Sequence, residues 1–480
     1  MTKPSIGPTM PDSERWYTGI TRYQWTVLLI ASLGWIFDVF EGQIFVASMQ
    51  EAMPSLAPPG ATEGRIALYN NVALAAFLMG GAIGGIAFGM LSDRLGRKRV
   101  LSLTILFYSV FTCLSAFSQQ WWHLAGFRFL VALGVGGEWA VASSLVAEVF
   151  PKKARAHVGG IFHASSVLGT YLAVAAGTFL IGNAALLQWS KSAQLDWLGQ
   201  FIDPTSLPWR LGFAIGVFPA LLIIWIRRSL KEPESWQTAR ERAASRPDEP
   251  MGAINELFRG RLLQRTLVGV TLAAVGLATF WGAHIYGKDM LQTAVEQRYL
   301  AAETPSGQIL NEAQQAAVIE RHSVALKRWE MLGMFLVTTG GGMGLLTFGP
   351  LCQRIGRRGA FLIFQIGGLV SALLVFQVFR TVNVLLIALP IFGFLTLGMH
   401  AGYAIYFPEL YPTRLRGTGT GLCFNAGRIL AAPILFVVGW VRSEWGYSLP
   451  DVASALSFLF LIGIATLWFA PETRGRELPA

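Results

Sequence analysis

The 480-residue chain is 53% hydrophobic, is only 14% charged and has a mean hydropathy of +0.49. This apolar content exceeds that of soluble domains, so the composition indicates a polytopic membrane protein. The net charge of +10 does not indicate a nucleic-acid partner, because the basic residues lie in short turns between apolar runs. Cys113, Cys352 and Cys423 stand singly, which predicts neither a disulfide framework nor a metal site.

Apolar runs of membrane-spanning length dominate the chain. A bilayer core about 30 Å thick needs about 20 helical residues to cross it. Because backbone polar groups in lipid must be satisfied within a segment, we expect helices, and runs this long do not fit a β-barrel. The predicted spans are 25–48, 66–91, 99–118, 121–147, 157–182, 207–228, 266–290, 327–351, 360–380, 383–408, 416–441 and 450–469.

Twelve spans place both termini on the same side of the membrane. On that side lie 26 of the lysines and arginines, against 10 on the other side and two inside spans. By the positive-inside rule the termini are therefore expected to be cytoplasmic, in the cell (inner) membrane. The expected organisation is a cytoplasmic segment 1–24, a six-helix bundle 25–228, a polar cytoplasmic loop 229–265, a second bundle 266–469 and a cytoplasmic tail 470–480.

Two outer loops are longer than a simple crossing requires. They are 183–209 and the Gln-, Ala- and Glu-rich piece 291–327, which predicts an amphipathic helical excursion.

The chain repeats itself. GMLSDRLGRKR begins at Gly89, and GPLCQRIGRR begins 260 residues later at Gly349. A second pair of segments lies 261 residues apart and aligns Glu148, Pro151 and Arg155 with Glu409, Pro412 and Arg416. The sequence therefore predicts a tandem duplication, that is, two pseudo-symmetric six-helix bundles.

Glycines recur on one face of the second span and again in the eighth. Small residues at four-residue spacing let two helix backbones approach closely in a membrane. This pattern fits static packing as well as a sliding contact between the two halves. The glycines concerned are Gly80, Gly81, Gly84, Gly85 and Gly89, and then Gly340, Gly341, Gly342 and Gly344.

Several charged residues fall inside predicted spans. A charge in the bilayer core costs several kcal/mol, so each should face a wet cavity or a partner. Asp38 and Glu41 lie three residues apart in the first span. In the fourth, Glu138 follows Arg128 by roughly 15 Å along the helix axis at 1.5 Å per residue. Arg428 lies deep in the eleventh span.

Polar and aromatic neighbours of these charges complete a candidate substrate site. The candidate substrate-binding residues are Arg128, Arg428, Asn425, His163, Tyr403, Trp35 and Glu138. A structural role stays open for several residues: a fixed buried ion pair for Asp38 and Arg128, and hydrogen-bonded packing for His163, His284 and His400.

The turn GMLSDRLGRKR resembles the signature of the major facilitator superfamily, and its partial echo extends the resemblance over nearly the whole chain. RFLVALGVGGEWA at 128–140, AEVFPKKAR and PWRLGF resemble the metabolite:proton and sialic-acid-type symporters, which are related to sugar porters. The resemblance implies a substrate site midway between two halves that rock around it.

The resemblance also implies roles for individual residues. Asp38 corresponds to a first-helix acid linked to proton coupling, Arg128 corresponds to the fourth-helix arginine that pairs with it, and Glu41 joins them as a proton-coupling candidate. One departure is Gln353, which replaces the counterpart of Asp93 and predicts a weaker second latch. The candidate gating residues are Asp93, Arg94, Arg97, Glu148, Arg155, Glu409 and Arg416.

From these features we expect proton-coupled symport of a small organic anion, since a guanidinium fork suits a carboxylate. A sugar or zwitterionic osmolyte is the alternative solute, with Arg428 then structural. A non-transporting sensor is a further alternative, although neither predicted terminal segment has room for a signalling domain. Without HExxH or GxSxG motifs we expect no enzyme activity and no cofactor. The expected partners are the anion, the proton and the lipid bilayer, with a monomer as the functional unit.

Overall fold

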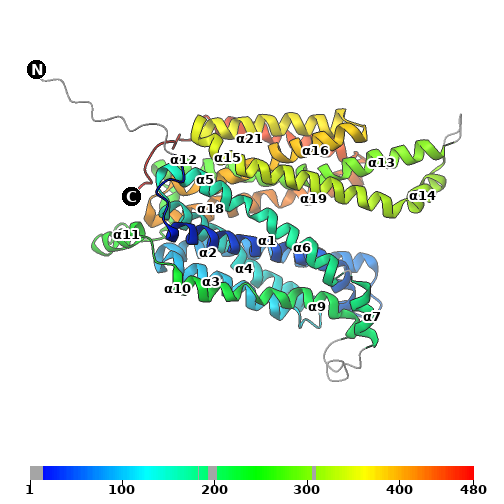
Figure 1. Ribbon diagram of the computed structural model, residues 1–480, viewed down its shortest axis with the longest axis horizontal. Helices are drawn as coiled ribbons and strands as arrows, with labels where there is room; N and C mark the ends of the chain where they lie inside the picture. Colours follow the sequence, from blue (N-terminus) through cyan, green and yellow to red (C-terminus); the bar gives the residue numbers. More distant parts are fainter. Residues whose placement is uncertain (1–14, 182, 193–202, 305–309) are drawn as a thin grey trace, which may run out of the picture.

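The computed structural model describes residues 15–181, 183–192, 203–304 and 310–480, and within them every regular element is a helix (Figure 1). Parts of the predicted N-terminal segment and of both long outer loops lie outside these residues. Eleven continuous helical stretches are long and apolar enough to cross a bilayer. One of them, Ser323–Val378, contains the predicted span 327–351 and all but the last two residues of the predicted span 360–380. The described helices thus account for all twelve predicted spans and confirm the all-α membrane fold.

The first half is built from helices that follow the predicted spans closely. Its elements are α1 (Arg22–Leu56), α2 (Glu63–Leu95), α3 (Arg97–Ser115), α4 (Trp121–Val149), α5 (Lys152–Ala164), α6 (Ser166–Ala176), the π-helical turn Gly177–Ile181, α7 (Ala184–Ser192), α9 (Leu207–Ala214) and α10 (Ala220–Ser229).

A connecting segment and the second half follow. Their elements are α11 (Glu234–Ser245), α12 (Gly260–Gly282), α13 (Gly287–Glu303), α14 (Glu312–Arg321), α15 (Ser323–Leu373), α16 (Val382–Leu397), α17 (Ala401–Leu410), α18 (Arg416–Ala431), α19 (Pro433–Trp445), α20 (Leu449–Ser457) and α21 (Leu459–Thr466). Helices α13 and α14 confirm that the piece 291–327 is largely helical.

The two halves lie side by side with their helices along the long axis of the molecule (Figure 1). Helix α2 packs on α18 and α5 packs on α15, so these four helices join the halves. The described chain begins and ends at one end of the bundle, here called the terminal end, where α11 also lies (Figure 1). Helices α7, α13 and α14 lie at the far end.

The sequence repeat is also a structural repeat. Gly96 and Gly356 break the chain between consecutive spans with φ angles of 107° and 88°, which favour glycine. At each break an acid accepts a hydrogen bond from the first N–H groups of the next helical segment: Arg97 N donates to Glu232 at 2.7 Å and Arg357 N donates to Glu472 at 3.0 Å. Negative charge at a helix N-terminus is favourable, so both halves use the same device.

The glycines of α2 face two different neighbours. A Cβ at Gly80 or Gly84 would collide with the backbone of α4 in the same half. A Cβ at Gly89 would lie 2.6 Å from the carbonyl oxygen of Gly417 on α18, in the other half. The face toward α4 is static packing within one bundle. The face toward α18 belongs to the contact between the halves.

Candidate functional site

Three carboxylic acids lie in the core of the first half. Asp38 and Glu41 on α1 are 1% and 0% exposed, and Glu138 on α4 is 0% exposed. None of their carboxylate oxygens accepts a hydrogen bond from a donor in the described part of the chain. The Glu138 carboxyl lies against α1 at Gly34, where a Cβ would collide with it, and it interacts directly with Asp38. The three acids therefore form a buried acidic cluster between α1 and α4.

Arg128 lies beyond this cluster toward the far end. Its Nη2 donates to Ser115 Oγ at 2.8 Å, and its guanidinium carbon lies 5.5 Å from the Phe45 ring and 4.7 Å from the Phe213 ring. Its Nε and Nη1 are buried and have no hydrogen-bond partner among the described residues. The guanidinium is thus held between aromatic rings, with two donors still unused.

The expected pairing of Asp38 with Arg128 is not formed. Helices α1 and α4 run antiparallel, so Gly34 is level with Glu138 and Phe45 is level with Arg128. Asp38 precedes Phe45 by seven residues, about 10 Å along the axis. The acid whose charge acts on Arg128 is Glu41, one turn farther along α1, although the two do not reach ion-pair distance.

Arg428 on α18 reaches into the space between the halves. Its side chain is partly exposed. It lies against Gly81 of α2, since a Cβ added to Gly81 would be only 2.6 Å from Arg428 Nη1. Among the described residues it forms no ion pair and donates no hydrogen bond, while its guanidinium carbon lies 5.2 Å from the Phe424 ring. The charge that acts on it is that of Asp38, in the opposite half.

Asn425 lies one turn before Arg428. Its Nδ2 donates to the carbonyl oxygen of Gly421 at 2.9 Å, and its buried Oδ1 has no partner in the described chain. A Cβ at Gly85 of α2 would collide with this amide. Asn425 is thus part of the contact between α2 and α18.

His163 on α5 is surrounded by tryptophans. Its Nδ1 accepts a hydrogen bond from Trp139 Nε1 at 3.2 Å, and its backbone carbonyl accepts one from Trp35 Nε1 at 3.3 Å. Trp139 stacks on Phe424 of the other half at 4.1 Å between ring centroids. A neutral histidine that accepts at Nδ1 carries its hydrogen on Nε2, so His163 keeps one donor for another group.

Three other polar residues of the second half near this site are hydrogen-bonded. Tyr403 OH donates to the carbonyl oxygen of Leu272 at 2.9 Å. His284 and His400 bond to Thr396 Oγ1 at 2.7 Å and to the carbonyl oxygen of Gly276 at 3.2 Å. For His284 and His400 the structure supports the packing role that the sequence left open. Tyr403, predicted to bind substrate, has its hydroxyl engaged by the backbone of α12.

Tyr108 of α3 is a polar residue that the sequence analysis did not identify. Its hydroxyl is fully buried and forms no hydrogen bond of normal geometry within the described residues. It nevertheless lies close enough to Glu138 to interact with it. A polar stripe at helical spacing, Tyr108, Thr112 and Ser115, marks this face of the third span and was a usable signal. Trp139 was also missed, because a tryptophan in an apolar helix looks like ordinary packing.

A network of ion pairs joins the halves at the terminal end. Arg97 pairs with Asp93 at 2.5 Å and with Glu148 at 2.8 Å, and Glu148 also pairs with Arg416 of α18 at 2.8 Å. Asp93 accepts hydrogen bonds from the first two backbone N–H groups of α18 after Arg416, at 2.9 and 2.8 Å, and from the Thr418 hydroxyl. Four of the candidate gating residues therefore form one fully paired cluster.

The second half has a smaller counterpart. Glu409 pairs with Arg357 at 2.6 Å and accepts from the Thr473 hydroxyl at 2.6 Å. Arg155 donates to the carbonyl oxygen of Ala147 at 3.1 Å and interacts electrostatically with Glu409. Gln353 makes no contact like those of Asp93, since its Oε1 is buried without a partner in the described chain. The asymmetry agrees with the weaker second latch that the sequence predicted.

Arg94 lies apart from this network. It is exposed, and its Nε donates to the carbonyl oxygen of Met251 at 3.3 Å in the segment that connects the halves. The signature thus holds residues of two kinds, of which Asp93 and Arg97 join the halves and Arg94 does not.

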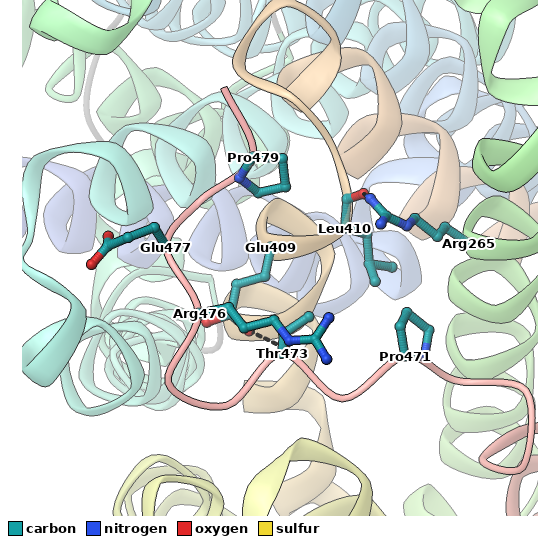
Figure 2. Close-up of a pocket in the computed structure, with 8 residues that line it drawn as sticks. All are labelled: Arg265, Glu409, Leu410, Pro471, Thr473, Arg476, Glu477 and Pro479. Atoms are coloured by element: carbon teal, nitrogen blue, oxygen red, sulfur yellow. Dashed lines mark hydrogen bonds between the residues drawn. The ribbon is translucent and has the colours of Figure 1, made fainter. Parts of the chain in front are cut away.

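The chain's last residues run across the terminal end. Figure 2 shows them curving past Glu409. Arg265, Arg476 and Pro479 are among the residues that line a cavity of about 120 Å³ there. The carbonyl oxygen of Pro479 accepts from Arg416 Nη2 at 2.8 Å. This cavity lies beside the ion-pair network and away from Arg428, so it is not the candidate substrate site.

Glu472 in this tail is a half-buried acid outside the spans. Burial opposes its charge, but the backbone N–H groups of Arg357, Arg474 and Arg358 outweigh burial and hold the pKa of this carboxyl below its usual value. The charged form of Glu472 therefore stabilises the break at Gly356.

Comparison with known proteins adds independent evidence. The Major Facilitator Superfamily profile matches residues 26–298. A metabolite transport protein of Haemophilus influenzae is 29% identical over 96% of this chain and 99% of its own length. The sialic acid transporter of Escherichia coli K12 is 27% identical over 93% of this chain and 96% of its own length. The solved proton:xylose symporter XylE has a similar fold, with a TM-score of 0.70, 16% identity, and coverage of 95% of this chain and 98% of that one.

Proposed function

The chain belongs to the Major Facilitator Superfamily, a family of transporters and not of enzymes, and from this premise we propose that it carries a small organic anion across the membrane together with protons. That it is a multi-pass membrane transporter of metabolites follows from the family and its relatives. The observation that supports an anionic substrate is Arg428, a partly exposed guanidinium between the halves that forms no ion pair with any described residue. A carboxylate can accept two parallel hydrogen bonds from such a group.

The proposed site is bounded by both halves. Arg428 and Asn425 contribute from α18, while His163 and Trp35 contribute from the first half with one imidazole donor and an aromatic wall. The sialic acid transporter, whose substrate is a carboxylic acid, supports this class of solute.

Alternating access supplies the proposed motion. We assign the terminal end to the cytoplasm by the positive-inside rule, so the ion-pair network closes the cytoplasmic side in this structure. Residues 25–228 and 266–469 then rock as two bodies, and opening this side requires the contacts of Asp93 and Glu148 with α18 to separate.

Coupling follows from the position of Asp38 opposite Arg428. A charged Asp38 competes with the substrate for the guanidinium, and a proton on Asp38 removes that competition. Protonation from outside therefore favours substrate binding. Release of the proton to the cytoplasm restores the attraction of Asp38 for Arg428 and expels the anion.

Arg428 is the decisive test. In proteoliposome counterflow with monocarboxylates, sialic acid, sugars and betaines, wild type should prefer an anion, and Arg428→Ala should lower its affinity roughly 10- to 100-fold, since hydrogen bonds to charged groups contribute about 1.5–3 kcal/mol. Arg442→Ala, which changes an exposed arginine on α19, should behave as wild type. Unchanged anion selectivity in Arg428→Ala would contradict the proposal and favour a neutral solute.

A further inference from the structure

The acidic cluster of the first half has two different environments. Glu41 lies beside Thr112 and Gly216, and a Cβ added to Gly216 would come within 2.6 Å of Glu41 Oε1. The cation that acts on Glu41 is Arg128. Asp38 and Glu138 instead have each other as nearest charged partner. The cluster therefore consists of one acid facing a cation and two acids facing each other.

The pair of Asp38 and Glu138 lacks donors. All four carboxylate oxygens are buried without a hydrogen-bond donor by strict geometry in the described chain. The Tyr108 hydroxyl on α3 likewise has no hydrogen bond of normal geometry in the described chain, but it interacts with Glu138. The cation acting on Asp38 is Arg428, across the interface, whereas no cation among the described residues is found to act on Glu138.

Among the described residues, the charged or titratable groups that act on the pair come from the helices around it. They are Glu41 on α1, Tyr108 on α3 and Arg428 on α18. Of these, Tyr108 supplies a hydroxyl and Arg428 supplies a positive charge. Arg128 on α4 acts on Glu41 instead, and His163 of α5 is bonded to Trp139.

Two carboxylates in contact away from water repel each other strongly, whereas one proton between them turns the repulsion into a hydrogen bond. We propose that Asp38 and Glu138 share a single proton in this conformation and together form the proton-carrying site, with Glu138 as its second member. Glu138, placed among the substrate-binding residues by the sequence, thereby moves to the coupling machinery.

The step involves only a proton and a charge. On protonation the pair goes from two negative charges to one, so the pull on Arg428 weakens without any covalent change. When Asp38 again carries a full charge opposite Arg428, the proton has left the pair. The use of this step in transport rests on the proposed function, but the sharing of the proton does not.

The sharing is tested without any substrate. Purified full-length protein in lipid is titrated while the infrared C=O band of protonated carboxyl groups is followed. Because the two sites interact, Asp38→Asn and Glu138→Gln should each change the pH midpoint of the band by about one unit or more. Glu477→Gln, which changes an exposed acid at the terminal end, should leave the midpoint unchanged. Equal midpoints in wild type and Glu138→Gln would overturn the proposal.

A second variant guards against misfolding. Glu138→Asp keeps a carboxyl group and should retain a titrating band that is coupled to Asp38, provided that its thermal unfolding matches wild type. Loss of that coupling in a folded Glu138→Asp protein counts against the proposal, since the shorter acid still lies beside Asp38.

A transport measurement then separates the two proposals. In Glu138→Gln, counterflow of the anion should continue, while uptake should no longer respond to a pH gradient. If wild type carries no anion but the infrared coupling is present, the proposed function fails and the proton site stands. If wild type carries the anion and Glu138→Gln keeps its full response to the gradient, the proton site fails alone.

Discussion

The charges at the terminal end and those in the centre differ in how completely they are paired. The side chains of Asp93, Arg97, Glu148 and Arg416 are each 0% exposed, and each has at least one ion-pair or hydrogen-bond partner. Asp38, Glu41, Glu138 and two nitrogens of Arg128 are equally buried and lack such partners. A satisfied buried network fixes one arrangement, whereas unsatisfied buried charges are expensive unless they exchange partners.

The difference in pairing suggests different roles for the terminal-end network and the central charges. The network at the terminal end holds the halves together in one conformation. On the proposed function, the central charges bind a proton or a solute, which offsets part of the cost of burying them. Variants in the two regions should therefore fail in different ways.

The largest effect is expected from Asp38→Asn in the centre. Without a proton-accepting carboxyl opposite Arg428, uphill accumulation should fall to an internal-to-external ratio of about one, because binding is no longer coupled to the proton. Exchange of labelled for unlabelled substrate should remain, since it needs no net proton movement. Both rates are measured in the same proteoliposomes, and full concentrative uptake by the variant would refute the coupling scheme.

A smaller effect is expected from Glu148→Gln in the network. Removing one partner of a buried ion pair costs about 3–5 kcal/mol in the paired state, so the closed conformation should lose population. Spin-label distances between the two halves at the terminal end should then broaden toward longer values.

Arg94→Gln is the matched control for this change. Arg94 lies in the same signature but is exposed, and within the described chain its side chain bonds only to Met251. The spin-label distances between the halves in Arg94→Gln should therefore equal those of wild type. Identical distance distributions in Glu148→Gln and wild type would show that the network does not set the closed state.

The smallest effect is expected at Glu472, where charge supports a helix start outside the spans. Because the folded pKa of this carboxyl lies below its ordinary value, its stabilising contribution is present above the unfolded pKa of about 4.3 and is lost as pH falls through the folded value. Glu472→Gln should therefore lower the midpoint temperature of thermal unfolding at neutral pH. The decrease should be smaller at acidic pH.

Glu477→Gln serves as the control in that experiment. Its side chain is 76% exposed and lies 3.9 Å from Lys152, so screening leaves it little influence on stability. A pH profile for Glu472→Gln that parallels wild type throughout would remove Glu472 from the account.

Much of the fold followed from the sequence for a simple reason. A span must satisfy its own backbone, so length and hydropathy alone place the helices. The repeat of GMLSDRLGRKR placed Gly96 and Gly356 at equivalent breaks, and the terminal-end cluster of Asp93, Arg97, Glu148 and Arg416 could be identified as a latch.

The partners of the central charges could not be obtained in this way. Asp38 and Arg128 are both single charges in apolar helices, and nothing in their spacing states how far one helix is displaced along the other. That displacement sets Glu41 nearest to Arg128 and Glu138 beside Asp38. The polar stripe of the third span could have pointed to Tyr108, but its interaction with Glu138 depends on which face of α3 meets α4.

The sequence by itself determined the membrane class, the helices, the duplication and the list of buried charges, because each of these depends on local composition or on spacing along one chain. Only the tertiary structure decided which charges act on one another, including that of Asp38 on Arg428 in the opposite half. Such contacts depend on the relative translation and rotation of packed helices, and a shift of one helical turn, about 5.4 Å, exchanges one set of partners for another.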